Sequence, residues 1–178
     1  MSELKPPVSD TDHRLGPGDA PVTLVEYGDY ECPHCGHAQP IVEEVRKRMG
    51  RRLDFVFRHF PLTNAHPHAA PAAEAAEAAA SQGQFWEMHE SLFAHQDALE
   101  PKDLLARARK LGLDAARFEQ ELADGIHAAR VQRDFRSGVR SGVNGTPTFF
   151  VNGHRHDGPW DADSLLEALA AAAGAAGR

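Results

Sequence analysis

The sequence predicts an α/β protein in which helices flank a mixed β-sheet and an all-helical segment is inserted between the strands. Three observations predict it: strand, helix and strand patterns alternate up to residue 60, helical patterns fill the middle, and strand character returns near residue 148. The middle stretch, about 75 residues long, is far longer than a crossover between strands requires. We therefore expect an α/β domain over residues 21–64 and 144–178, with an inserted helical subdomain over residues 65–143.

The first strand is expected to begin at Val22. Residues 1–20 are rich in Pro, Gly and Asp and show no sustained periodicity, which predicts a flexible lead-in to the domain. From Val22 to Tyr27 apolar side chains occupy both sets of alternating positions, as in a strand covered on both faces. This pattern places Glu26 on an apolar face.

A helix and a second strand follow this first strand. After Cys32, apolar residues recur every three or four positions as far as Met49, and Gly50 is placed to end the helix. Residues 53–60 are dense in β-branched and aromatic side chains, which predicts a strand. The first cysteine therefore lies between a strand and a helix.

The later elements are predicted by turn residues and periodicity. A helix is expected from about Asp161 to the end, and Asn152-Gly153 predicts a two-residue hairpin turn between strands at 148–151 and 154–157. The helical subdomain is expected to contain helices at 66–83, 85–95, 102–111, 115–122 and 126–141.

Charge and hydropathy exclude several classes of partner. The net charge of −7 disfavours nucleic acid, whose phosphates bind clustered Lys and Arg. No apolar run approaches the roughly 18 residues that a membrane helix needs, so membrane insertion is not expected. The first residues lack the apolar core of a secretory signal, which predicts a cytoplasmic location.

Cys32 and Cys35 are the only two cysteines of the sequence and are separated by Pro33 and His34. A two-residue spacing between a strand and a helix indicates a redox motif. The positive end of the helix dipole and a basic His34 should lower the pKa of Cys32 below the ~8.5 of a free cysteine. Pro33 suits the first helical turn because it lacks an N–H group. We predict that Cys32 attacks and Cys35 resolves.

Half of a zinc site is the alternative interpretation of the pair. His34 and His37 are conceivable further ligands, but a structural zinc ion takes four ligands and the sequence has no second CxxC. The remaining candidate ligands, His66, His68, His154 and His156, lie in predicted loops and on a hairpin, where we expect them to be solvated. We therefore assign no metal and no cofactor beyond a redox-active Cys32–Cys35 disulfide.

Five segments together resemble the bacterial disulfide-bond protein A (DsbA) family of the thioredoxin superfamily. The resemblance extends over about residues 18 to 172 and implies a thioredoxin-like fold that carries an inserted helical domain. The segments are Glu26–Cys35, Pro40, Arg58–Leu62, Gln84–His89 and Gly142–Phe149.

The resemblance also implies roles for three further residues. Glu26 matches a buried acid that takes or relays the proton of the second cysteine, although a solvated carboxylate at a strand end is the alternative. Thr146 and Pro147 match a cis-proline loop that binds an extended substrate; otherwise they form an ordinary turn. Aromatic residues such as Phe85 and Phe93 are expected in the core.

The predicted function is thiol-disulfide exchange with protein or peptide substrates, by a monomer that has an unidentified redox partner. The motif favours an oxidant, whereas a reducing cytoplasm favours a reductase, isomerase or stress-response role. A glutathione-dependent isomerase or transferase on a related fold is one alternative, disfavoured because such relatives generally lack a second cysteine. A non-catalytic metal-binding or chaperone module is the other.

Overall fold

The computed structural model describes residues 2–176, which divide into two compact units. The sheet unit contains the chain up to Gly28, His37–Arg58 and the chain from Arg136 onward, and the helical unit contains Asp29–Gly36 and His59–Phe135. Residues 1, 177 and 178, which the predicted lead-in and closing segment included, lie outside the described residues.

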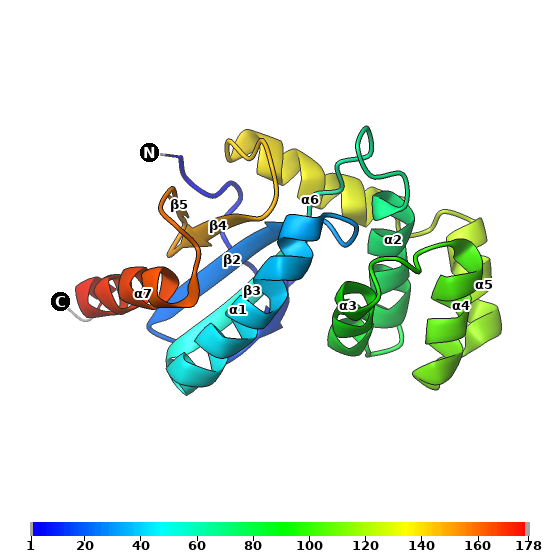
Figure 1. Cartoon of the computed structure of the whole chain (residues 1–178), viewed down its shortest axis with the longest axis horizontal. Coiled ribbons are helices and arrows are strands. Elements are labelled where there is room, and N and C mark those ends of the chain that lie inside the picture. The colour runs from blue at the N-terminus through cyan, green and yellow to red at the C-terminus, as the bar shows by residue number, and fades with distance from the viewer. Residues whose placement is uncertain (1, 177–178) are drawn as a thin grey trace. The chain divides into compact units, whose positions relative to one another are not determined.

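A five-stranded mixed sheet with the order β1-β3-β2-β4-β5 forms the centre of the sheet unit (Figure 1). β4 pairs antiparallel with both β2 and β5, and β1 pairs antiparallel with β3. The strands are β1 (His13–Leu15), β2 (Val22–Gly28), β3 (Leu53–His59), β4 (Thr148–Val151) and β5 (His154–His156).

The predicted hairpin is confirmed. Asn152 and Gly153 join β4 to β5 with φ angles of 46° and 82°, the positive values that a tight two-residue hairpin turn requires. The closing helix α7 (Ala162–Ala176) contacts β2 and β4, with Leu165 and Leu169 buried. β4, β5 and the final helix therefore form where the local sequence signals place them.

The N-terminal residues differ from the predicted flexible lead-in, because they contribute β1 to the sheet. Asp12, next to this strand, accepts hydrogen bonds from Arg58 Nε at 2.8 Å and Arg58 Nη2 at 2.9 Å. Arg14 within β1 donates from Nε to Asp54 at 2.9 Å. A three-residue strand shows no measurable periodicity, and its partners are distant in sequence, so local patterns could not reveal it.

The helical unit contains α2 (Ala69–Ala80), α3 (Phe85–Ala94), α4 (Pro101–Lys110), α5 (Ala115–Ala123) and the first part of α6 (Ala128–Arg140). Figure 1 shows α2 to α5 side by side, and α2 contacts each of the other three. Eight residues of α2 are buried and seven of them are alanines, whose small side chains permit close helix packing. The expected helices of this region are all present.

The boundaries of the helical unit differ from the predicted insertion at residues 65–143. The unit gains residues 29–36, which include both cysteines, and it ends at Phe135, inside α6. Hydrogen bonds from residues within 62–96 to residues 29–36 account for the first difference. None of the helices within residues 2–176 is long and apolar enough to span a membrane.

Candidate active site

Cys32 is the last residue of the four-residue connection between β2 and α1 (Pro33–Met49), and Cys35 lies in the first turn of α1. Both are free thiols, with Cys32 3% exposed and Cys35 fully buried. The Gly36 amide donates to the Cys32 carbonyl at 3.1 Å, which closes the first turn, and Pro33 occupies the first helical position. Cys32 is therefore next to the positive end of a 17-residue helix.

Asp29 fixes the backbone in front of Cys32. Its carboxylate is buried and accepts four hydrogen bonds: Oδ1 from the Glu31 amide at 2.7 Å and the Cys32 amide at 3.2 Å, Oδ2 from the Leu62 amide at 2.9 Å and His66 Nδ1 at 2.8 Å. A buried carboxylate is stable only when its oxygens are satisfied in this way. Asp29 thus joins the cysteine loop, residues 29–36, to residues 62–66.

The expectation of a solvated side chain is wrong for His66, whereas the side chain of His68 is 40% exposed. The side chain of His66 is 20% exposed and bonded to Asp29, and Glu31 accepts hydrogen bonds from the His68 amide and from His68 Nδ1, the latter at 3.0 Å. Burial lowers the pKa of His66, but the hydrogen bond to Asp29 and the negative charges of Asp29, Cys32 and Glu31 outweigh it and raise the pKa above its ordinary value.

Gln96 holds the cysteine loop through two backbone carbonyls. Its Nε2 donates to the Tyr30 carbonyl at 2.9 Å and to the Cys32 carbonyl at 2.8 Å. A Cβ atom on Gly36 would lie 2.1 Å from Gln96 Oε1, so Gly36 leaves the space that the Gln96 amide occupies. The roles of Asp29 and Gln96 were not predicted from the sequence, because no local signal connects residues this far apart.

Aromatic residues pack against the cysteine loop, as expected of core residues. The Tyr30 hydroxyl lies 2.9 Å from His89 Nδ1, and both side chains are buried. The Phe93 ring lies 4.8 Å from the Tyr30 ring, measured between centroids. Phe85, Met88 and Phe93 are buried, whereas Trp86 is half-buried. The loop therefore rests on a rigid apolar layer of its own unit.

The other predicted site residues are distributed between the units. His34 is exposed in the first turn of α1, and the ring of His37, in the sheet unit, faces Trp160. Glu26 is 1% exposed within β2, which excludes the alternative of a solvated strand-end carboxylate. The peptide bond between Thr146 and Pro147 is cis and immediately precedes β4 in the sheet unit.

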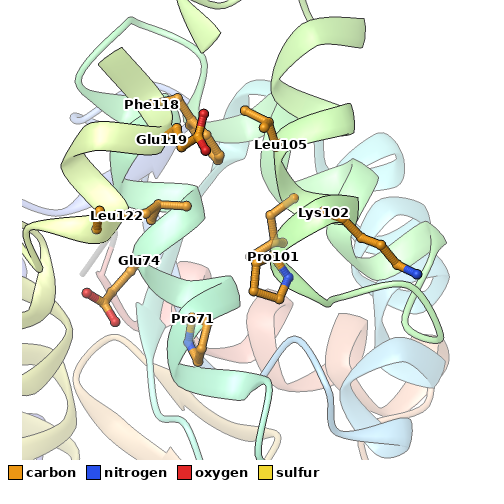
Figure 2. A pocket seen from close by; sticks show the side chains of 10 residues that line it. Pro71, Glu74, Pro101, Lys102, Leu105, Phe118, Glu119 and Leu122 are labelled. Atoms are coloured by element: carbon orange, nitrogen blue, oxygen red, sulfur yellow. The ribbon is translucent and has the colours of Figure 1, made fainter. Parts of the chain in front are cut away.

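A separate pocket of about 560 Å³ lies between α2, α4 and α5 (Figure 2). Its lining is mostly apolar and includes Leu105, Phe118 and Leu122, with Glu74 and Glu119 among them. No cysteine or histidine lines it, so it offers no thiol and no imidazole for chemistry. The chemically equipped site of the helical unit is the cysteine loop.

Comparison with solved structures relates this architecture to known oxidoreductases. BdbD of Bacillus subtilis in its oxidised form superposes with a TM-score of 0.86 at 26% identity, covering 98% of each chain. A thioredoxin-like oxidoreductase of Silicibacter pomeroyi superposes with a TM-score of 0.81 at 27% identity, over 92% of this chain and 93% of the other. Wolbachia pipientis DsbA1, 21% identical, shares the fold with a TM-score of 0.82 over 99% and 98% of the chains.

Comparison of sequences gives relatives with a different name. The chain is 53% identical over 171 residues to Na(+)/H(+) antiporter NhaA 3 of Salinispora tropica, and 52% identical to NhaA 1 of Salinispora arenicola. The match covers 96% of this chain but only 26% of each of these relatives, so the chain spans about a quarter of their length. The family model described as thioredoxin matches residues 8–171. The chain therefore belongs to the thioredoxin family, the solved structures that it resembles include DsbA proteins, and its predicted fold is confirmed.

Proposed function

We propose that the chain exchanges disulfides with protein thiols through Cys32 and Cys35. The observation that carries the proposal is the position of Cys32 directly before α1 and of Cys35 in the first turn of that helix. Backbone N–H groups and the helix dipole at this end favour a thiolate, which is both the nucleophile and the better leaving group in disulfide exchange. BdbD and the thioredoxin-like oxidoreductase of Silicibacter pomeroyi, both above 25% identity, support the same chemistry.

In the oxidising direction, a substrate thiolate attacks the Cys32 sulfur of the Cys32–Cys35 disulfide and displaces the Cys35 thiolate. A second substrate thiolate then attacks the substrate sulfur of the mixed disulfide and displaces the Cys32 thiolate. The substrate loses two electrons as its disulfide forms, and the cysteine pair gains them. In the reducing direction Cys32 attacks a substrate disulfide, and Cys35 resolves the mixed disulfide that results.

Glu26, Thr146 and Pro147 complete the proposed machinery. Glu26 is a buried carboxylate six positions before Cys32, and its proposed role is to accept the proton of Cys35 as that thiol becomes a nucleophile. The proposed role of the loop at Thr146 and Pro147 is backbone pairing with an extended substrate, which would permit broad substrate choice. His34 is proposed to stabilise the Cys32 thiolate.

The curated relatives carry the name of an antiporter, and this chain matches only a quarter of each. We propose that this quarter contributes thiol-disulfide exchange and not ion transport, because its fold is that of a thioredoxin-family protein. The cytoplasmic location, the monomeric state and the redox partner stay predictions.

Turnover with a protein disulfide tests the proposal. The wild-type chain should catalyse insulin disulfide reduction by glutathione or the oxidation of a reduced, unfolded protein, and Cys32→Ser should fall to the uncatalysed rate in both assays. Equilibration with glutathione buffers gives the reduction potential and separates oxidant from reductant. An inactive wild-type chain that binds one zinc ion tightly would instead support the metal-binding alternative, and activity confined to glutathione conjugates would support the transferase.

A further inference from the structure

We propose that His66 is a positioning residue for the Cys32 thiolate and acts through the Asp29 carboxylate that binds both residues. This inference rests on the proposed function, because it concerns the charge state of the same attacking cysteine. The geometry that carries it is a single buried carboxylate with the Cys32 amide on Oδ1 and the His66 ring on Oδ2, at 3.2 Å and 2.8 Å.

The negative charge of Asp29 opposes the Cys32 thiolate, and a positive charge on His66 offsets it. The four hydrogen bonds of Asp29 fix the backbone of the cysteine loop, but a buried negative charge next to Cys32 disfavours a second negative charge on the Cys32 sulfur. A protonated His66, which donates from Nδ1 to Asp29, neutralises that carboxylate. The loop thus keeps its hydrogen-bonded anchor without a net charge that opposes the thiolate.

The charged groups that face His66 come from the cysteine loop. Asp29, Cys32 and Glu31 all favour the imidazolium form and together outweigh its burial, which holds the pKa of His66 above its ordinary value. The neighbouring His68 is hydrogen-bonded to Glu31. Each of the two carboxylates of the loop is therefore paired with one histidine. An influence of Cys32 on His66 is reciprocal, because a proton on His66 must favour the Cys32 thiolate by the same free energy.

The first test measures the coupling between the charge of Cys32 and the protonation of His66 in the wild-type chain. NMR titration of the histidine rings should give a higher pKa for His66 in the reduced chain than in the oxidised chain, since the disulfide carries no thiolate charge. The resonance is assigned as the one that His66→Asn removes. A pKa of His66 that does not change with the redox state would overturn the proposal, and this readout requires no variant to retain activity.

The second test measures the pKa of Cys32 from the pH dependence of its alkylation. His66→Asn keeps an N–H donor near Nδ1 but cannot be charged, and we expect it to raise the pKa of Cys32 by about one unit, the lower end of the effect of a nearby opposite charge. The matched control is His127→Gln, which removes the same kind of histidine-carboxylate pair, with Glu121, elsewhere in the helical unit. An equal pKa of Cys32 in wild type, His66→Asn and His127→Gln would contradict the proposal.

Both tests are independent of substrate turnover. A chain that shows the His66 coupling but exchanges no disulfide with insulin would count against the proposed function alone. A chain that turns over normally but lacks the coupling would count against the His66 proposal alone. If His66→Asn fails to fold, the ring resonance of His66 is assigned by through-bond NMR correlations in the wild-type chain, and the redox dependence of its titration decides.

Discussion

Two buried aspartates each connect two segments of their own unit, but they pair with different cations. In the sheet unit, Asp12 accepts two hydrogen bonds from Arg58, whose side chain is 3% exposed. In the helical unit, Asp29 accepts a hydrogen bond from His66, whose side chain is 20% exposed. Each pair attaches a segment without strong secondary structure to the body of its own unit.

Arg58 and His66 differ in whether their positive charge can change with pH. Burial lowers the pKa of Arg58, but hydrogen bonds to Asp12 and Tyr27 outweigh it and raise the pKa further above neutrality. The sheet unit therefore has a permanently charged anchor for its N-terminal residues. His66 is a titratable group, so the anchor of the cysteine loop responds to pH and to the charge of Cys32. An arginine suits a structural attachment, whereas a histidine suits an attachment next to a thiolate.

The largest effect is expected from breaking the permanent pair. Arg58→Met leaves the buried Asp12 carboxylate without its partner, and we expect the free energy of unfolding to fall by about 3–5 kcal/mol, measured by urea denaturation at pH 7. Arg48→Met is the control, because Arg48 pairs with Glu44 and Asp163 at the surface and should contribute about 0–1 kcal/mol. Equal losses in the two variants would show that Asp12 needs no buried cation.

A smaller effect is expected at the second attachment of the cysteine loop, the neutral amide of Gln96. Gly36→Ala places a methyl group where the Gln96 amide lies, so its two hydrogen bonds must break. Each hydrogen bond is worth about 0.5–1.5 kcal/mol. The two together exceed the roughly 0.5–1 kcal/mol by which alanine is preferred over glycine in a helix, so we expect a loss of about 1 kcal/mol in the free energy of unfolding.

The effect of Gly36→Ala on the free energy of unfolding should change sign when Gln96 is truncated. In a Gln96→Ala background the space is empty, and Gly36→Ala should then stabilise the chain by about 0.5–1 kcal/mol, the usual difference between alanine and glycine in a helix. Denaturation of all four chains of this cycle measures the coupling. Additive effects would mean that Gln96 does not occupy the space beside Gly36 in solution.

The smallest effect is the pH dependence of stability at the titratable pair. Although burial opposes it, the hydrogen bond and charge of Asp29 raise the pKa of folded His66. Its stabilising contribution is therefore complete below the unfolded pKa of ~6.5 and is lost as the pH rises through the folded value. The difference in melting temperature between wild type and His66→Asn should shrink from pH 5.5 to pH 8.5. A difference that grows with pH would contradict the assigned direction.

The sequence predicted the features that depend on neighbouring residues. The hairpin at Asn152 and Gly153, the helix that begins after Cys32 and the helices of the middle region follow from turn chemistry and periodicity. The missed features depend on distant partners: Asp29 and His66 are 37 positions apart, as are Glu31 and His68. Gln96 is 64 positions from Cys32. Only tertiary structure brings these residues together, so no local pattern could predict their contacts.

The roles of the two cysteines are tested most directly by trapping. Cys35→Ser cannot resolve a mixed disulfide, so incubation with a protein substrate should accumulate a covalent adduct at Cys32, visible by mass spectrometry and removed by dithiothreitol. Cys32→Ser should form no adduct, because it lacks the thiol that precedes the positive end of α1 and attacks in the proposed scheme. Trapping by Cys35→Ser alone is the result that the account predicts, and equal trapping by both variants, or by neither, would contradict it.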